Sequence, residues 1–207
     1  MGKWITFEGL GGSGKSTQVA LLKEWFIINK IDFVLTKEPG GTHLGGKLRT
    51  ILKEKQDPPI ELLTELLLFE ADRHETVEKI VIPNISSGKY VISDRGIDGS
   101  IAYQGFGRGM DLELIDTFTK VATNNRKPDL TIFIDVEPIE AKRRINIREN
   151  KESDQFDLED IEFQERVRQG FLYCSKNDPC RVRVLNGMKN IGELQEEIVK
   201  IIQQIKV

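Results

Sequence analysis

The residues best suited to chemistry form a glycine-rich run near residue 10. Positions 9–16 read GLGGSGKS and fit the phosphate-binding pattern G-x-x-x-x-G-K-[ST] at every specified position. The glycines let the backbone curl so that successive N–H groups point at phosphate oxygens, and the following helix adds its positive N-terminal end. We therefore predict a nucleoside triphosphate site. Its members are Gly9, Leu10, Gly11, Gly12, Ser13, Gly14, Lys15, Ser16 and Thr17.

Two side chains of this run, and a pair further along, predict how the phosphates are held. Lys15 would reach the β- and γ-phosphates, and the Ser16 hydroxyl would complete a Mg²⁺ shell. Asp94 ends an apolar stretch, where a protein of this kind needs a carboxylate near Mg²⁺. Its neighbour Arg95 can hold a second phosphate with paired hydrogen bonds. Asp-Arg alone is a weak signal, since a salt bridge at a strand end gives the same pair.

Phe69 and Arg73 lie four residues apart in an apolar helical pattern, so they share one helix face. A ring with an adjacent guanidinium can stack on a nucleobase and hydrogen-bond its edge. Taken alone, Phe69 follows three leucines and fits a core position better than a binding one. The segment gains a binding function only from the residues that accompany it.

A basic segment follows the fourth predicted strand and contains Arg143, Arg144 and Arg148. One interpretation is a solvated helix face. The other is a mobile lid, about residues 142–157, whose arginine neutralises charge on a transferring phosphoryl group. Arg144 and Arg148 are four apart and would face one bound anion. The acidic run over 152–165 is expected to keep this segment exposed.

The elements that must position these residues alternate along the chain. Short apolar stretches, β-branched or aromatic, predict strands at 4–7, 33–36, 90–93, 130–134 and 182–185. Helical patterns follow the glycine-rich run and recur at about 44–55, 59–82, 111–125, 137–150, 157–175 and 190–205. This alternation predicts an α/β fold, a doubly wound five-stranded parallel sheet flanked by helices. Ligands gather at the carboxyl ends of such strands, where polar and glycine residues crowd this sequence.

The composition limits the class of protein. The 207 residues suit one domain, 1–207, and 39% hydrophobic with 30% charged residues predicts a soluble globular chain. A net charge of −3 gives no overall attraction to nucleic acid or anionic membrane. Cys174 and Cys180 are close enough in sequence for a disulfide, but two free thiols are the favoured interpretation. With no signal peptide and no apolar run that could span a bilayer, the expected location is the cytoplasm.

Several motifs occur in order along the chain and are more specific together than the glycine-rich run alone. They are Phe7-Glu8-Gly9, Gly14-Lys15-Ser16-Thr17, Glu38-Pro39-Gly40-Gly41-Thr42, Leu67-Leu68-Phe69-Glu70-Ala71-Asp72-Arg73, Asp94-Arg95 and Ala102-Tyr103-Gln104-Gly105. In this combination the chain resembles the bacterial thymidylate kinases over nearly its whole length. The resemblance implies a P-loop kinase fold, ATP and Mg²⁺, phosphoryl transfer to thymidine 5′-monophosphate (dTMP), and a homodimer, with helices 59–82 and 111–125 as its candidate interface.

The resemblance also implies roles for individual residues. Phe69 would stack on thymine, Tyr103 would pack beside the deoxyribose and disfavour a 2′-hydroxyl, and Arg95 with Arg49 would hold the acceptor phosphate. The P-loop contains no arginine, so the chain is similar to the type whose lid supplies one, Arg148 or Arg144. The expected substrate-binding residues are Glu38, Arg49, Phe69, Arg73, Arg95, Ser100, Tyr103 and Gln104, and the expected catalytic ones are Lys15, Arg95, Arg144 and Arg148.

Three glycines depart from the pattern of that family. Gly11 stands where the family has Asp or Glu, thought to touch the sugar 3′-hydroxyl; Gly96 replaces an aromatic residue or histidine; and Gly99 replaces a small hydroxyl residue, with Ser100 adjacent. A lost carboxylate forfeits a charge-assisted hydrogen bond, worth roughly 1.5–3 kcal/mol. The result would be lower efficiency, a role taken over by another acidic residue, Glu8 or Asp98, or a shifted acceptor preference.

Two alternative functions remain open from the sequence. The glycine substitutions allow a kinase for another nucleoside or deoxynucleoside monophosphate. A nucleotide-dependent switch is the other, but GTP switches carry an Asn-Lys-x-Asp guanine motif that residues 125–129 do not fit. A switch also gives no reason for the aromatic and amide residues that accompany the P-loop.

Overall fold

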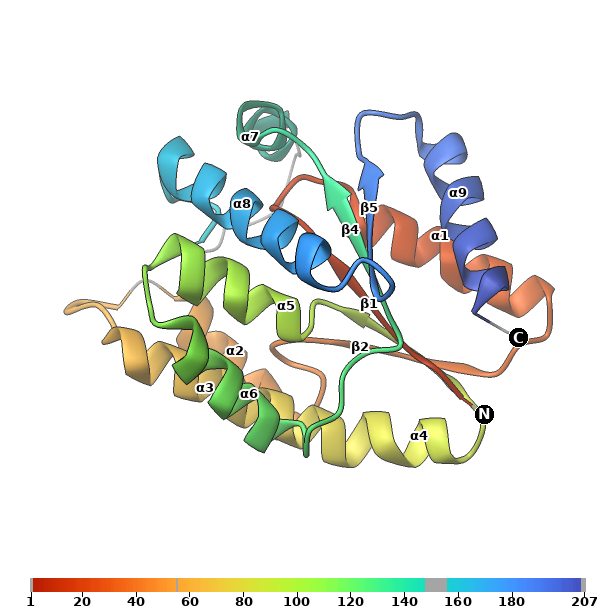
Figure 1. Ribbon diagram of the computed structural model, residues 1–207, viewed down its shortest axis with the longest axis horizontal. Helices are drawn as coiled ribbons and strands as arrows, with labels where there is room; N and C mark the ends of the chain where they lie inside the picture. Colours follow the sequence, from red (N-terminus) through yellow and green to blue (C-terminus); the bar gives the residue numbers. More distant parts are fainter. Residues whose placement is uncertain (1, 55, 148–155, 206–207) are drawn as a thin grey trace.

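Five parallel strands, in the order β2-β3-β1-β4-β5, form the central layer of the protein (Figure 1). The computed structural model describes residues 2–54, 56–147 and 156–205. All five predicted strands are present, and each runs one residue further than predicted. They are β1 (Trp4–Glu8), β2 (Phe33–Lys37), β3 (Tyr90–Asp94), β4 (Leu130–Asp135) and β5 (Val182–Asn186).

The register of the central strands brings the predicted phosphate-binding residues together. β1 lies between β3 and β4, and Phe7 is paired with Asp94 on one side and with Ile132 on the other. All five residues of β1 are buried, as expected for a strand covered on both faces. The carboxyl ends of β1 and β3 therefore adjoin, and residues that follow them meet at one edge of the sheet.

Helices cover both faces of the sheet. α1 (Lys15–Ile28) and α9 (Ile191–Gln204) pack together on one side of the sheet in Figure 1, and α5 (Ile97–Ser100) and α8 (Ile161–Asn177) lie on the other. This arrangement confirms the predicted doubly wound sheet. The remaining helical elements are α2 (His43–Lys53), α3 (Leu62–Thr76), η1 (Val77–Val81), α4 (Ile82–Ser86), η2 (Ile101–Gly107), α6 (Leu112–Ala122) and α7 (Pro138–Ile147).

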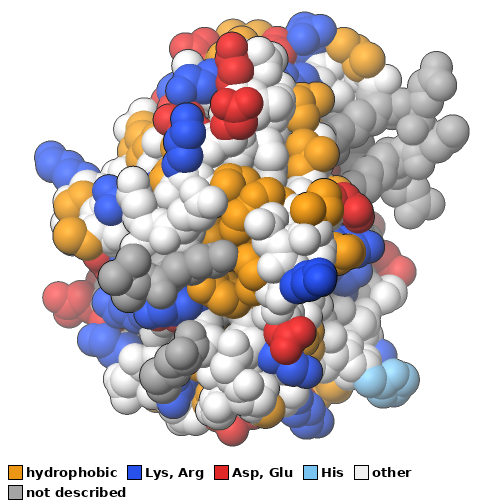
Figure 2. Space-filling model, turned by 90° about the vertical axis from the view of Figure 1, so that its right-hand side faces the viewer, with side chains coloured by type: hydrophobic (Ala, Val, Ile, Leu, Met, Phe, Trp, Pro, Cys, Tyr) orange, Lys and Arg blue, Asp and Glu red, His pale blue; other side chains and the backbone are white. Residues whose placement is uncertain are grey.

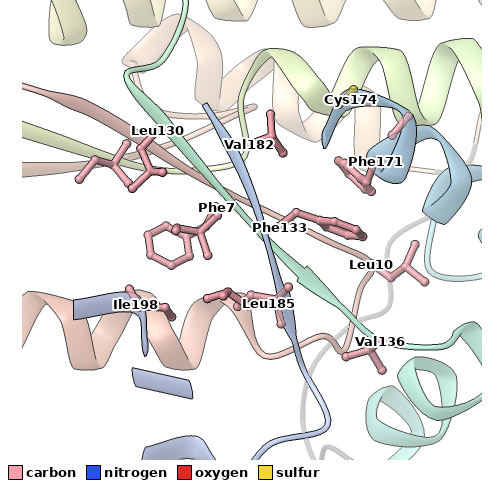
Figure 3. Packing of buried hydrophobic residues seen from close by; sticks show 14 of the residues in the cluster. Phe7, Leu10, Leu130, Phe133, Val136, Phe171, Cys174, Val182, Leu185 and Ile198 are labelled. Atoms are coloured by element: carbon pink, nitrogen blue, oxygen red, sulfur yellow. The ribbon is translucent and has the colours of Figure 1, made fainter. Parts of the chain in front are cut away.

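The main hydrophobic core fills the space between the sheet and these two helical layers. Phe171 and Cys174 of α8 approach the sheet from one side, and Ile198 of α9 approaches from the other (Figure 3). The rings of Phe133 and Phe171 stack with centroids 5.0 Å apart. Burial of these large apolar side chains is the main force that fixes the helices against the sheet.

Helix ends follow the capping residues, which explains two corrections to the predicted bounds. α8 begins at Ile161 rather than near 157, because the Asp160 carboxylate accepts a hydrogen bond from the Phe163 N–H at 2.6 Å. The helix predicted over 59–82 starts at Leu62 and continues as far as Ser86. Just before Pro83, the Ile82 N–H donates to the Val77 carbonyl five residues back, in the widened π-helical turn η1, and the chain continues as a helix through Pro83, which has no N–H to donate.

The helical segment α5–η2, residues 97–107, was not predicted, because its four flanking and internal glycines resemble a loop. The structure shows that Gly107 of this segment and Gly170 of α8 allow close helix packing. A Cβ atom on Gly107 would lie 2.8 Å from the Phe163 ring of α8, and one on Gly170 of α8 would lie 2.6 Å from Cα of Ala102. Residues 97–107 and α8 therefore pack with their backbones close together.

The surface carries both signs of charge. On the face seen in Figure 2, lysine and arginine side chains are interspersed with aspartate and glutamate around a group of apolar ones. The two cysteines are free, as predicted, with Cys174 buried and Cys180 exposed. Within the part of the chain that the structure describes, no helix has both the length and the hydrophobicity needed to cross a membrane.

Candidate active site

The P-loop lies between β1 and α1 and folds as the glycines require. Gly9, Gly12 and Gly14 have φ values of +144°, +78° and +99°, which other residues rarely adopt. The Lys15 ammonium donates hydrogen bonds to the carbonyls of Gly9 at 2.8 Å and Leu10 at 2.9 Å. Burial, and then the neighbouring Arg95 guanidinium, lowers the pKa of Lys15 to about 7. A phosphate bound here would supply the negative charge that this buried ammonium needs.

Ser16 and Asp94 are brought together as predicted. The Ser16 hydroxyl donates to Oδ2 of Asp94 at 3.3 Å, across the junction of α1 and β3. A hydroxyl and a carboxylate are the hard oxygen ligands that Mg²⁺ takes beside substrate phosphates. Among the described residues no group of three or more acidic, histidine or cysteine side chains is placed to hold a metal. The Ser16 and Asp94 oxygens fit a Mg²⁺ whose other ligands are phosphate oxygens.

Arg95 is held in an unusual backbone conformation at the end of β3. Its φ is +76°, in the left-handed region that costs a non-glycine residue energy. Two hydrogen bonds bracket it: the Ser93 hydroxyl donates to the Arg95 carbonyl at 2.7 Å, and the Gly96 N–H donates to Oε1 of Glu8 at 2.7 Å. The guanidinium lies over the Tyr103 ring, 4.8 Å from its centroid, and donates to the Tyr103 hydroxyl at 3.1 Å. Its position is thus fixed before any ligand binds.

Glu8 lies beside Arg95, although from the sequence it was predicted only as a substitute for the carboxylate missing at Gly11. Its side chain is fully buried, it lies 3.7 Å from the Arg95 guanidinium, and Oε2 accepts no hydrogen bond from the described residues. Burial raises its pKa to about 8, against the attraction of Arg95. The signal available in the sequence was a carboxylate at the last position of an otherwise apolar strand.

We expect Glu8→Gln to flatten the pH dependence of stability. Between the ordinary pKa of 4.5 and the folded-state pKa of about 8, the folded protein holds a proton that the unfolded chain lacks. The free energy of unfolding therefore falls as pH rises through this window, and glutamine removes that term while keeping the bond from Gly96.

Thermal unfolding of the ligand-free protein between pH 5 and 8 measures this slope. Burial also raises the pKa of Glu38 to about 7, so part of the pH dependence of unfolding remains in both the wild type and Glu8→Gln. Glu113→Gln is the matched control because Glu113 is exposed on α6. An unchanged slope in Glu8→Gln would contradict the assignment of the buried proton.

One cavity adjoins the P-loop and extends to an aromatic end. Phe69 and Tyr103 line it together with Phe156, whose ring centroid lies 5.9 Å from that of Phe69 and 5.6 Å from that of Tyr103. Phe69 and Arg73 both line the cavity, so the predicted shared helix face is confirmed. The full lining includes Gly11, Lys15, Ser16, Lys37, Glu38, Arg49, Phe69, Arg73, Asp94, Arg95, Ser100, Tyr103, Gln104, Phe156 and Asp157.

Arg73 is buried, and nearly all of its N–H groups donate hydrogen bonds. Nε donates to Glu38 at 2.9 Å, Nη1 to Glu70 and to the Ser100 hydroxyl at 3.0 Å, and Nη2 to the Gly96 carbonyl at 3.1 Å. These bonds use four of the five N–H groups of a guanidinium, so among the described residues one N–H of Nη2 remains for a ligand. Glu38 and Ser100, both predicted site residues, thus act on Arg73.

Gln104 is oriented by a charged pair outside the cavity. Its Nε2 donates to Glu65 at 2.8 Å, and Glu65 in turn lies 3.8 Å from the Arg108 guanidinium. Burial raises the pKa of Glu65, against the hydrogen bond from Gln104 and the charge of Arg108. With its nitrogen held in this way, Gln104 presents its carbonyl oxygen as the group available to a ligand. The sequence did not single out Arg108, which stands alone among glycines.

Arg49 also lines the cavity, at the side formed by the turn after β2. Its Nη1 donates to the Pro39 carbonyl at 2.7 Å, and Gly40 in the same turn has a φ of +110°. A Cβ atom on Gly40 would lie 2.8 Å from Cδ of Arg49. Glycine at this position therefore lets the arginine lie close against the backbone of the turn.

The predicted lid is only partly brought to the cavity. Arg148 lies outside the described residues. Arg144 does not line the cavity: its Nε donates to Glu140 at 2.7 Å and its Nη1 to the Gly187 carbonyl at 3.0 Å. The expectation of an exposed segment is wrong at Phe156, which is buried against the rings of Phe69 and Tyr103. Because the residues around Phe156 are acidic, the sequence pattern did not indicate that its side chain is buried.

A P-loop followed by a helix, with an arginine beside it at the end of the adjacent strand, is typical of a P-loop phosphotransferase for small phosphorylated substrates. Comparison with known proteins narrows this class. The family model for thymidylate kinase matches residues 7–198. The chain is 41% identical to the thymidylate kinase of Kosmotoga olearia, over 95% of this chain and 93% of that protein, and 42% identical to that of Carboxydothermus hydrogenoformans, over 95% of both.

The fold agrees with these sequence matches. A crystal structure of thymidylate kinase from Ehrlichia chaffeensis superposes with a TM-score of 0.79 at 38% identity, covering 98% of this chain and all of that one. The chain belongs to the thymidylate kinase family, whose members transfer a phosphoryl group from ATP to dTMP.

Proposed function

We propose that this cavity holds ATP and dTMP at the same time, with their phosphates meeting at Arg95. The observation that carries the proposal is the continuity of the cavity, which runs from Lys15 and Ser16 of the P-loop to Phe69 and Gln104 at the aromatic end. Phosphoryl transfer needs positioning and charge neutralisation more than covalent chemistry. An uninterrupted space lined by cations between two nucleotide sites meets that need.

On the donor side, the P-loop amides and Lys15 hold the triphosphate of ATP. Ser16 and Asp94 would hold Mg²⁺, which would neutralise negative charge on the phosphates. The γ-phosphate then lies against the Lys15 ammonium, which exchanges its bonds to the loop carbonyls for phosphate oxygens. We also propose that the lid supplies a further arginine, and separate alanine variants at positions 144 and 148 would identify which one.

On the acceptor side, Phe69 stacks on thymine and Tyr103 packs beside the deoxyribose, where it leaves no room for a 2′-hydroxyl. The carbonyl oxygen of Gln104 accepts a hydrogen bond from thymine N3–H. The remaining N–H of Arg73 Nη2 donates a hydrogen bond to a thymine carbonyl. Cytosine offers an acceptor and an amino group at these positions. The pair therefore favours thymine over cytosine, with Arg95 and Arg49 holding the 5′-phosphate.

The Phe69→Ala variant tests the acceptor site. Stacking of an aromatic ring on a base is worth roughly 1–3 kcal/mol, so we expect KM for dTMP to rise about 10-fold or more. KM for ATP should change little, because Phe69 lies at the far end of the cavity from the P-loop. The measurement is a coupled assay of ADP release, with Phe106→Ala, an aromatic deletion outside the cavity, as the control. Equal increases in the two KM values would make Phe69 a core residue.

A panel of acceptors tests the specificity of the same site. With Mg²⁺ and ATP, dTMP should be converted in clear preference to dUMP, UMP, CMP, dGMP and AMP. Preference for another monophosphate would mean that the glycine substitutions had reshaped the pocket. ATP hydrolysis without transfer to any acceptor would favour a nucleotide-dependent switch.

We propose that the protein acts as a homodimer in the cytoplasm. α3 and α6 pack side by side and expose large apolar residues, which a second copy of the chain would cover. Sedimentation of the wild type and a Leu67→Glu variant tests this interface: a dimer that dissociates in the variant supports it, and a wild-type monomer excludes it. The exposed apolar residues are Leu62, Leu63, Leu67, Leu114 and Val121.

A further inference from the structure

Gly11 is the P-loop position at which the family pattern has an acidic side chain. Its backbone does not require glycine, since only Gly9, Gly12 and Gly14 of this loop have positive φ. What distinguishes position 11 is its surroundings. A Cβ atom there would overlap Oδ1 of Asp157 and would lie 3.1 Å from Cδ1 of Ile145. The space that a P-loop side chain would fill is taken by the carboxylate of Asp157.

The position of Asp157 is fixed by the residue before it. Phe156 is buried between Phe69 and Tyr103, the two rings at the aromatic end of the cavity. Its amide oxygen is also held, because Gln164 of α8 donates to the Phe156 carbonyl at 2.6 Å. Asp157 therefore stands between the rings assigned to the base and the P-loop assigned to the triphosphate, and it lines the cavity. That interval is where the sugar of an acceptor nucleotide must lie.

We propose that Asp157 accepts a hydrogen bond from the sugar 3′-hydroxyl of the acceptor, in the space that Gly11 leaves open. The inference rests on the proposed function. dTMP has a single sugar hydroxyl, at C3′, because C2′ is unsubstituted and C5′ carries the phosphate. A carboxylate that reaches this hydroxyl from the segment ahead of α8 replaces one that would reach it from the P-loop. The two arrangements exclude one another, because both side chains would need the same volume.

The test compares dTMP with 3′-deoxythymidine 5′-monophosphate, which lacks the hydroxyl. Asp157→Asn is expected to lower kcat/KM for dTMP about 10-fold. It should lower kcat/KM for the 3′-deoxy acceptor by less than about twofold, with KM for ATP and the unfolding temperature unchanged. Equal losses on both acceptors would overturn the role of Asp157. Failure of the wild type to convert dTMP would instead contradict the proposed function.

A carboxylate exchange provides a second, independent test. Gly11→Asp alone should lower kcat/KM for dTMP, because the new side chain overlaps Asp157. The double variant Gly11→Asp with Asp157→Gly should recover at least about fivefold over Asp157→Gly, since one carboxylate again faces the hydroxyl. A double variant no better than Asp157→Gly overturns the proposal. The recovery should disappear with the 3′-deoxy acceptor.

Discussion

Replacement of Lys15 by methionine is expected to lower kcat about 10²- to 10³-fold. This is the typical cost of removing one preorganised hydrogen-bond donor from an active site. Methionine keeps much of the length and packing of the buried side chain but cannot donate to a phosphate. Methionine loses the two bonds from the ammonium to P-loop carbonyls, but it also removes a buried charge, whose desolvation lowers the pKa of Lys15 to about 7. Because these two effects on stability oppose each other, we expect the main loss to appear in turnover.

The measurement is kcat at saturating ATP and dTMP, together with the unfolding temperature. Lys23→Met on the exposed side of α1 is the matched control and should leave both values unchanged. Near-normal turnover in purified Lys15→Met would contradict the assignment of this loop as the donor site.

Arg95→Ala is expected to reduce turnover at least about 10³-fold, the lower range for an arginine that stabilises the charge of a transferring phosphoryl group. The guanidinium lies between the P-loop carbonyl of Gly9, at 3.3 Å, and the Tyr103 hydroxyl, at 3.1 Å, so it faces both nucleotide sites. Arg95→Lys should rescue little, because an ammonium cannot form two parallel bonds to one phosphate.

Arg183→Ala, an exposed arginine on β5, is the control for this prediction. Arg95→Ala also removes the guanidinium that lies over the Tyr103 ring and faces Glu8, so the unfolding temperature is measured beside kcat to separate lost turnover from lost stability. A variant that keeps kcat and changes only KM for dTMP would limit Arg95 to binding the acceptor.

Much of the site could be predicted because its chemistry follows local patterns. The P-loop depends on glycines at fixed spacing, and Phe69 with Arg73 depends on helical periodicity. The strands were predictable because each is a short run of apolar residues bounded by polar ones. These signals need no knowledge of which segments meet in space.

The rest depends on contacts between distant segments. The helix at 97–107 was missed because its glycines are typical of turns, although Gly107 serves packing against α8. The contact of Glu8 with the site could not be predicted, because it depends on β3, which brings the Gly96 N–H to the Glu8 carboxylate. Asp157 could not be connected with Gly11, because the two residues are far apart in sequence and meet only through the burial of Phe156.

The close packing of η2 against α8 also limits how the site can move. Gly107 lies under the Phe163 ring and Gly170 lies on Ala102, so sliding one helix along the other would force side chains into backbone. The two helices are therefore coupled as one rigid block, which carries Tyr103 and Gln104 with it. Any movement that closes over the nucleotides therefore leaves Tyr103 and Gln104 in place relative to α8.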